Sequence, residues 1–442
     1  MGEGASADPS IERVKRGGVA AFGIFVIGAG LTYCSQLLIA RLVGADTFGI
    51  YAYVFAWMVV LAYFSALGFD VALLRFVPAY RAERAYSLLK GVIQYAERRA
   101  MAVSAGLVAL GILVVLLAPG MTTALRHTFL VGLFLVPVWA LLWIRSSAVR
   151  AFGGVVSALA PDRMVRDGML LVIVAVASFG FGVTLDAPWV MTATLVGSAV
   201  GLVLSSLAKH RLRPRILDGL TAEYSNAIWR RTALPLVIIA GVESLLNRTG
   251  VLLLGWTGHT TDAGIYGLAF NIAYLAALPR MAVNTLFAPT ISHLFARKDQ
   301  AMLQVLVSTS ALWTLCGAAA IALVLSVLAV PLMSWFGHGY AAGVPALRIL
   351  LIGQVFAASV GSQLHVMNMT GHERSAAVIL VVSTAVNALV SVIMIHEFGL
   401  TGAAIATTLT LILWNAGMAV FIWRHLELLP GVLGLPRKPM AS

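Results

Sequence analysis

The chain has 442 residues, of which 60% are apolar and only 11% are charged, and its mean hydropathy is +0.94. Because about a quarter of the residues in a soluble domain are charged, this composition excludes a soluble globular protein and predicts an all-α polytopic membrane protein. The net charge of +12 would suit a nucleic-acid surface. However, no block of basic residues is interleaved with aromatic residues, so we expect no nucleic-acid partner.

Twelve apolar stretches are long enough to cross the roughly 30 Å hydrocarbon core of a bilayer. In chain order they lie near residues 18–40, 48–70, 100–118, 127–144, 168–186, 188–208, 233–256, 263–284, 304–330, 345–367, 375–395 and 401–423. The polar residues 1–17 lack the short apolar region and cleavage site of a secretory signal. They are therefore predicted to form a cytoplasmic tail.

Lys and Arg residues concentrate on one side of these spans when the N-terminus is placed inside. The cytoplasmic groups are Arg13, Lys15 and Arg16; Arg75 to Arg99; Arg145 to Arg166; Lys209 to Arg231; Arg297 and Lys298; Arg374; and Arg424 to Lys438. The outer side keeps little besides Arg41, Arg126 and Arg348. This alternation predicts that both termini are cytoplasmic and that the positive charge serves topology and attraction to anionic lipid.

The longest inner stretches are residues 75–99 and 209–232. Residues 75–90 mix basic and apolar positions, which is typical of an amphipathic segment on a membrane surface. A solvated connector is the alternative, and the pattern does not separate the two. Cys34 and Cys316 both lie in apolar runs, so they are predicted to be core residues rather than metal ligands or a redox pair.

The seventh span, residues 233–256, carries charges where a membrane tolerates them least. At 1.5 Å rise per residue, Glu243 lies about 15 Å and Arg248 about 22 Å from the Ala233 end. A charge near the bilayer centre costs about 2.5–3.5 kcal/mol. Asn247 shares the face of Glu243, whereas Arg248 points about 140° away. The two charges are therefore not expected to neutralise each other, which favours a polar cavity inside a helix bundle. A structural ion pair between helices is the alternative.

The chain also repeats itself. Gly49-Ile50-Tyr51 recurs as Gly264-Ile265-Tyr266, 215 residues later, and Phe55 matches Phe270 at the same offset. A repeat of six helices keeps both halves in one orientation, so we expect them to be related by an axis along the membrane normal. The predicted division is an N-terminal lobe at 18–208, a basic cytoplasmic linker at 209–232, a C-terminal lobe at 233–423 and a cytoplasmic tail at 424–442.

Short motifs near the ends of several spans follow one another in a specific order. They are Ile39 to Tyr51, Leu67 to Phe76, Asp262 to Ala269, Met369 to His372 and Phe398 to Ala404. In order and spacing, over residues 15–425, they resemble the polysaccharide and oligosaccharide-lipid flippases of the multidrug/oligosaccharidyl-lipid/polysaccharide exporter superfamily. The resemblance implies twelve or fourteen helices in two six-helix lobes around a central cavity. The predicted helix count fits the shorter form, and the implied cargo is lipid-diphosphate-linked sugar.

A diphosphate crossing the membrane needs cationic partners, and arginine supplies charge-assisted, often bidentate hydrogen bonds. The candidates are Arg248, Arg41, Arg75 and Arg280, with Arg248 favoured by its depth. Side chains that snorkel to lipid head groups are the alternative for the other three. Amides suit sugar hydroxyl groups, and the candidates are Gln36, Asn247, Asn271, Asn284 and Gln363. Such amides also hold membrane helices together.

Two acidic residues are candidates for coupling transport to H⁺ or Na⁺, namely Glu243 and Asp70. Asp70 precedes Arg75 by five residues, so a neutralising partnership with that arginine is the alternative reading. No catalytic residue, metal site or cofactor is expected. The sequence contains no P-loop, no clustered carboxylates and no histidine pair with the spacing of metal ligands.

We therefore expect a flippase of the bacterial inner membrane that works by alternating access. It would move undecaprenyl-diphosphate-linked oligosaccharide repeat units to the outer leaflet for O-antigen, capsule or exopolysaccharide synthesis. A cation-coupled multidrug exporter or a peptidoglycan-precursor flippase of the same superfamily is the nearest alternative. A membrane-embedded polymerase or ligase, or a non-transporting scaffold, is a more distant one. The expected partners are the lipid-linked cargo, membrane lipids, a polymerase and other assembly proteins, and the expected oligomeric state is a monomer.

Overall fold

The computed structural model describes the backbone of residues 9–434. Outside the description lie residues 1–8 and 435–442 and the side chains of residues 9–22, 285, 286, 288, 289, 292, 293, 296 and 433. The predicted topology signals of Arg13, Lys15 and Arg16, and of the last two basic residues, Arg437 and Lys438, therefore fall outside the described side chains. Every regular element within 9–434 is helical, so the predicted all-α class is confirmed.

The chain forms two compact units, Met1–Gly241 and Val242–Ser442. The division lies inside a long helix, α9 (Asn226–Trp256), beyond the predicted linker at 209–232.

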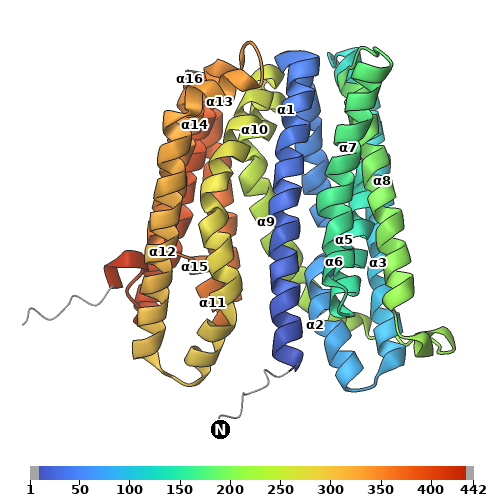
Figure 1. Ribbon diagram of the computed structural model, residues 1–442, viewed down its shortest axis with the longest axis vertical. Helices are drawn as coiled ribbons and strands as arrows, with labels where there is room; N and C mark the ends of the chain where they lie inside the picture. Colours follow the sequence, from blue (N-terminus) through green and yellow to red (C-terminus); the bar gives the residue numbers. More distant parts are fainter. Residues whose placement is uncertain (1–8, 435–442) are drawn as a thin grey trace, which may run out of the picture. The chain divides into compact units, whose positions relative to one another are not determined.

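The first unit is built from helices and short irregular helical turns that join them. Its elements are α1 (Pro9–Ala66), α2 (Phe69–Ala82), α3 (Tyr86–Leu117), α4 (Thr123–Gly132), α5 (Leu135–Ala151), α6 (Val155–Ala160), the π-helical turn η1 (Pro161–Val165), α7 (Arg166–Ala175), the π-helical turn η2 (Val176–Gly180), α8 (Ala187–Leu212), the 3₁₀ turn η3 (Arg215–Asp218) and the start of α9. Helix α8 packs against α4, α5 and α7, and α7 and α8 run side by side (Figure 1).

The second unit has the same character. Its elements are the end of α9, α10 (Thr260–Tyr274), the 3₁₀ turn η4 (Leu275–Ala277), α11 (Leu278–Ala296), α12 (Gln300–Val327), α13 (Ala329–Trp335), the 3₁₀ turn η5 (Tyr340–Gly343), α14 (Val344–Val360), α15 (Gln363–Met369), α16 (Glu373–Leu426) and the 3₁₀ turn η6 (Gly431–Gly434). Helix α14 is central, because it packs against α10, α12 and α16.

Eight stretches of the described residues are long and apolar enough to cross a membrane. Two of them, Gly23–Ala82 with 60 residues and Glu373–Leu426 with 54, greatly exceed the roughly 20 residues that one crossing needs. Each contains a break at a glycine with positive φ, Gly44 at +76° and Gly399 at +54°. Glycine adopts such angles without strain, and both breaks lie where the sequence separates two predicted spans. The count of twelve spans itself stays a prediction.

Large apolar side chains cover much of the outer surface, as a lipid-facing protein requires. Leu117, Trp256 and Phe181, for example, are 71%, 75% and 79% exposed. Cys34 and Cys316 are exposed as well, and both thiols are free. The prediction that they are core residues is wrong. In a membrane helix the lipid face is as apolar as the core, so an apolar run does not reveal which face a residue occupies.

Residues 75–99 differ in part from both sequence-based alternatives. Helix α2 continues to Ala82, a short turn follows, and α3 begins at Tyr86. Leu89 and Val92 of α3 are fully buried against Trp229 in one core cluster. The segment is amphipathic as predicted, and its apolar residues pack against other residues of the same chain, including Trp229. Residues 79 and 81–84 between the two buried parts are exposed, so the surface segment and the solvated connector stay open as alternatives for that part.

The basic linker is held on the first unit by polar contacts. Lys90 of α3 donates hydrogen bonds to the carbonyl groups of Leu217, at 2.9 Å, and Leu220, at 2.8 Å. The indole N–H of the fully buried Trp229 donates to the hydroxyl of Tyr80 at 2.9 Å. These contacts explain why the first unit extends through the linker into the beginning of α9.

A substitution at Gly91 tests this docking. A Cβ atom at Gly91 would lie only 1.8 Å from the carbonyl oxygen of Glu223 in the linker. Overpacking of this kind costs about 1–3 kcal/mol, so we expect Gly91→Ala to speed tryptic cleavage after Arg215 by about fivefold or more. Gly106→Ala is the matched control, because Gly106 lies in the same helix with nothing within 4 Å. Equal cleavage of both variants would show that the linker does not pack as described.

Each unit contains a tyrosine–threonine hydroxyl contact of the same kind, and the pair of contacts supports the repeat. In the first unit the hydroxyl of Tyr51 lies 3.2 Å from that of Thr194. In the second unit the hydroxyl of Tyr266 lies 2.8 Å from that of Thr407. Tyr266 is the residue that matches Tyr51 in the predicted 215-residue repeat. The corresponding hydroxyl contact therefore supports the same internal design in each unit.

Candidate functional site

A polar cavity lies within the second unit. The space between its lining atoms, including its open mouth, amounts to about 420 Å³. It is lined by Glu243, Leu246 and Asn247 of α9, Tyr274 of α10, Arg280 of α11, Gln354 of α14, Leu364 of α15, and Leu380, Leu411 and Trp414 of α16. Six helices thus contribute a carboxylate, a guanidinium, two amides, a phenol and an indole among four leucines. Apolar pockets with a few convergent polar groups are the usual form of a small-molecule site.

The charges of this cavity come from Glu243 and Arg280. They interact electrostatically, and the guanidinium of Arg280 also interacts with Tyr274. Glu243 and Arg280 do not approach within the 4 Å of an ion pair, and Arg280 forms none with any other side chain that the structure describes. Glu243 is exposed and Arg280 is half-buried, and a charge that is partly withdrawn from water is costly unless it has a partner. The cavity therefore offers a cation that an anionic ligand would stabilise, with a carboxylate nearby that limits the affinity.

Among the residues proposed from the sequence, the cavity brings together Glu243, Asn247 and Arg280. Glu243 and Asn247 are four positions apart on one helix face, which is why both reach it. Arg248, on a different face of α9, is half-buried and is not among the residues that line the cavity. Asn271 of α10 is exposed.

Two other candidate amides of the second unit have local partners. The amide nitrogen of Asn284 lies 3.3 Å from Nδ1 of His365. Gln363 is only 1% exposed, and its amide nitrogen donates to the carbonyl group of Val360 across the break between α14 and α15. These contacts are what helix adhesion and helix termination require.

In the first unit the sequence candidates are spread out. Arg41 and Arg75 are exposed, and Gln36 is half-buried in α1. The Asp70 carboxylate lies against the backbone N–H groups of Asp70 and Val71 at the start of α2, and it interacts with the charge of Arg150 on α5. The suggested Asp70–Arg75 pair is not among the ion pairs of the described side chains.

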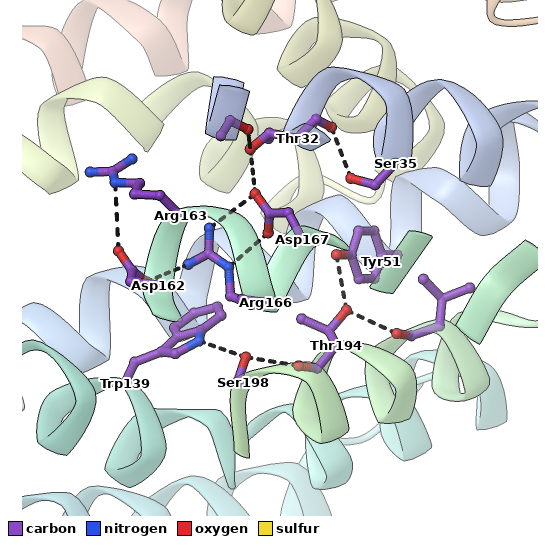
Figure 2. Close-up of polar contacts among 12 residues, drawn as sticks. Thr32, Ser35, Tyr51, Trp139, Asp162, Arg163, Arg166, Asp167, Thr194 and Ser198 are labelled. Atoms are coloured by element: carbon purple, nitrogen blue, oxygen red, sulfur yellow. Dashed lines mark hydrogen bonds and ion pairs between the residues drawn. The ribbon is translucent and has the colours of Figure 1, made fainter. Parts of the chain in front are cut away.

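A second polar cluster, shown in Figure 2, lies inside the first unit. Arg166 donates to Asp162 at 3.0 Å and to Asp167 at 2.8 Å, and these three side chains are only 7–14% exposed. The hydroxyl of Thr32 in α1 donates to the Asp167 carboxylate as well. Arg163 stands at the edge of the cluster: it lies 3.6 Å from Asp162 and its side chain is 49% exposed. The cluster joins α1 to the segment α6–η1–α7.

Close helix packing builds this cluster. Cβ atoms at Gly28 of α1 and at Gly197 and Gly201 of α8 would lie 2.8–2.9 Å from backbone carbonyl oxygens in η1 and the first residue of α7. The small residues therefore let two helices approach the backbone of the π-helical turn. π-helical turns of this kind are frequent at functional sites. The result is a rigid frame around the Arg166 ion pairs.

The charge pattern of the sequence assigns Arg166 to the cytoplasmic basic groups but does not reveal its ion pairs. In the structure its guanidinium is enclosed between two carboxylates. Asp162 and Arg166 are four residues apart, which is the spacing of an ion pair on one helix, and Asp167 follows directly. That spacing was the available signal. Arg145, also grouped as an anchor, pairs with Glu97 at 3.0 Å, and Lys209 binds the same carboxylate at 2.5 Å.

Comparison with known proteins gives this chain its relatives. A sequence profile described as polysaccharide biosynthesis protein matches residues 14–295, well over half of the chain. The chain belongs to the polysaccharide biosynthesis protein family. This family member is also 21% identical over 409 residues to an uncharacterized membrane protein of Methanocaldococcus jannaschii, and the match covers 87% of this chain and 78% of that protein.

Solved structures show the same fold for this family member. An inward-facing multidrug resistance MATE family transporter of the MOP superfamily superposes with a TM-score of 0.74 at 13% identity, covering 92% of this chain and 98% of the other. The lipid II flippase MurJ superposes with a TM-score of 0.63 at 15% identity, and the match covers 92% of this chain and 87% of MurJ. A MATE transporter of Vibrio cholerae gives 0.62 at 18% identity, covering 94% and 98%.

Family and fold together confirm the resemblance inferred from the motifs of the sequence. The chain is a multi-pass membrane protein with the all-helical, two-lobed fold of MOP-superfamily transporters. The solved structures that share this fold are described as a multidrug transporter and a lipid II flippase.

Proposed function

We propose that this protein is a flippase of the bacterial inner membrane, with both termini cytoplasmic. It moves undecaprenyl-diphosphate-linked oligosaccharide repeat units to the outer leaflet for synthesis of O-antigen, capsule or exopolysaccharide. The observation that carries the proposal is the cavity of the second unit, where Arg280 and two amides converge among leucines in a polysaccharide biosynthesis protein. Lipid-linked cargo is the substrate class that needs such a site.

The physical problem is to carry a charged, hydroxylated head group through an apolar layer. The polyisoprenoid tail can remain in lipid, so only the diphosphate and sugars need shelter. Arg280 would hold the diphosphate through charge-assisted hydrogen bonds, and Asn247 and Gln354 would meet hydroxyl groups. The nearby Glu243 would compete for Arg280, which keeps the affinity low enough for release. Protonation of Glu243, or binding of Na⁺ beside it, would modulate that competition and couple transport to an ion gradient.

Arg248, Arg41 and Arg75 remain proposed contacts at other stages of the passage. Replacing Arg248 with alanine removes up to two charge-assisted hydrogen bonds, each worth about 1.5–3 kcal/mol. We expect surface polysaccharide to fall at least tenfold while lipid-linked cargo accumulates on the inner leaflet. Arg348→Ala, an exposed arginine of α14, is the control and should export normally. Unchanged polysaccharide in the Arg248→Ala strain, at equal protein level, would count against a cargo role for Arg248.

Deletion of the gene tests the function as a whole. We expect loss of one surface polysaccharide and accumulation of its lipid-linked repeat unit, both reversed by the wild-type gene. A deletion strain with intact polysaccharides would contradict the proposal. If variants of this protein at the cavity charges Glu243 and Arg280 still support normal polysaccharide export, the protein would instead be a scaffold of the assembly complex.

A drug exporter is the second candidate, because Glu243 places an acidic group in the cavity, where it would attract cationic compounds. The solved MATE structures with the same fold are described as multidrug transporters. That function predicts hypersensitivity of the deletion strain to cationic dyes with unchanged polysaccharide. A peptidoglycan-precursor flippase, as MurJ is for lipid II, predicts lysis when the protein is depleted. These phenotypes separate the three functions.

A further inference from the structure

Six buried side-chain polar atoms of the second unit have no hydrogen-bond partner among the described residues, and two of the six belong to residues that line the cavity: the side-chain oxygen of Gln354 and the indole N–H of Trp414. Gln354 is only 6% exposed, and both side chains line the cavity that holds Glu243 and Arg280. One atom is an acceptor and the other a donor. Buried polar groups in proteins nearly always have a partner, so this pair marks a place where a ligand supplies both.

A second, adjoining cavity gives the pair its position. It shares Leu246, Asn247, Gln354, Leu411 and Trp414 with the first, and it is completed by Phe270, Leu350, Thr407 and Thr408. Asn247, Gln354 and Trp414 therefore border both spaces. On one side lie the charges of Glu243 and Arg280. On the other lie hydroxyl groups and an aromatic ring without charge.

This division matches the chemistry of a sugar attached to a phosphate. The cationic side suits an anion, and the uncharged side suits a ring with hydroxyl groups and apolar C–H faces. A hydroxyl group both donates and accepts, so the hydroxyl groups of one sugar can supply a donor to Gln354 and an acceptor to Trp414. A diphosphate ester at neutral pH has acceptors only. It can therefore receive the Trp414 N–H but can offer nothing to the Gln354 oxygen.

We propose that Gln354 and Trp414 recognise hydroxyl groups of the sugar next to the diphosphate and so distinguish sugar-bearing lipid carrier from bare carrier. The inference rests on the proposed flippase function and adds the residues that set its selectivity. A site built to hydrogen-bond a ligand hydroxyl rejects a ligand that lacks it, because the buried partner is left unpaired. Selection at this point keeps the empty carrier from occupying the transporter.

Binding by the purified full-length protein in nanodiscs tests the proposal. The probes are undecaprenyl diphosphate and the same lipid carrying one N-acetylglucosamine, and the readout is the dissociation constant of each. We expect wild type to bind the sugar-bearing lipid about tenfold more tightly. Gln354→Leu should remove this preference and leave the affinity for undecaprenyl diphosphate within about twofold. Trp414→Phe, which keeps an aromatic ring but lacks the N–H, should weaken the preference in the same direction. Trp423→Phe, an exposed tryptophan in the same helix, should change neither constant.

The outcomes are distinct. If wild type binds both lipids equally, the inference fails and the proposed function stands. If wild type binds neither lipid, the proposed function fails and the inference fails with it. The inference is overturned if Gln354→Leu and Trp414→Phe keep the tenfold preference, or if they lower the affinity for both lipids equally. The two atoms would then contact only bound water or serve packing. Melting temperatures of the variants identify any that do not fold, and the remaining variant then decides.

Discussion

Replacing Arg166 with methionine is expected to destabilise the first unit by about 3–5 kcal/mol, because the change leaves enclosed carboxylates without their cation. Asp162 and Asp167 both lie within 3.0 Å of this guanidinium and are largely covered by the protein. Methionine fills much of the space of the arginine stem, so the effect reports the charge more than a cavity.

The melting temperature of the detergent-purified protein measures this effect. A loss of 3–5 kcal/mol in a unit of this size corresponds to a fall of about 10 °C. Arg163→Met is the matched control, since Arg163 lies three residues earlier, in the adjoining turn η1, and its substitution removes the same charge. Its side chain is 49% exposed and sits 3.6 Å from Asp162, so its substitution should lower the melting temperature by less than about 3 °C.

A rescue variant separates charge from packing. Adding Asp162→Asn and Asp167→Asn to Arg166→Met removes the uncompensated charges and should restore most of the stability, because neutral replacement of a whole buried ionic group is often tolerated. An Arg166→Met protein that melts like wild type would contradict the ion-paired cluster. A triple variant as unstable as the single one would assign the loss to packing instead.

Arg280→Ala is expected to reduce export of surface polysaccharide by about 100-fold. A hydrogen bond to a charged group contributes about 1.5–3 kcal/mol, and each 1.4 kcal/mol is tenfold in affinity. We expect the loss of binding free energy to lie at the upper end of this range, because Glu243, without its cationic neighbour, would repel the diphosphate. Glu243→Gln should have the opposite effect on binding: the cargo binds more tightly and leaves more slowly.

Export is measured in a deletion strain complemented at matched protein levels. Arg348→Ala, an exposed arginine in the same unit, should support wild-type export. A folded Arg280→Ala protein that exports more than about half of the wild-type polysaccharide would place the cargo elsewhere.

Some of this arrangement could be predicted from local geometry. A spacing of four residues placed Glu243 and Asn247 on one face of a helix, and both line the cavity. The glycines that break α1 and α16 lie between predicted spans. The Gly-Ile-Tyr repeat reappears as matching tyrosine–threonine contacts in each unit. These features depend on residues close in sequence or on a pattern that occurs twice.

The rest depended on packing between distant segments. Gln354 and Trp414 reach the cavity from helices more than 100 residues beyond Glu243, and no spacing rule connects them. Arg166 resembled a cytoplasmic anchor because it stands at the border of an apolar run, and only the approach of α1 and α8 encloses it. The prediction for the two cysteines was wrong for a different reason: in a membrane protein, apolar neighbours in the sequence do not distinguish a buried helix face from an exposed one.

Translocation by the purified protein in liposomes tests the central claim most directly. Undecaprenyl-diphosphate-linked oligosaccharide is incorporated into both leaflets, and sugars in the outer leaflet are oxidised with membrane-impermeant periodate. With the wild-type protein, inner-leaflet cargo should become accessible at least ten times faster than with Arg280→Ala or in protein-free liposomes. Equal rates in all three preparations would contradict the claim that this protein carries lipid-linked sugars through a cavity built around Arg280.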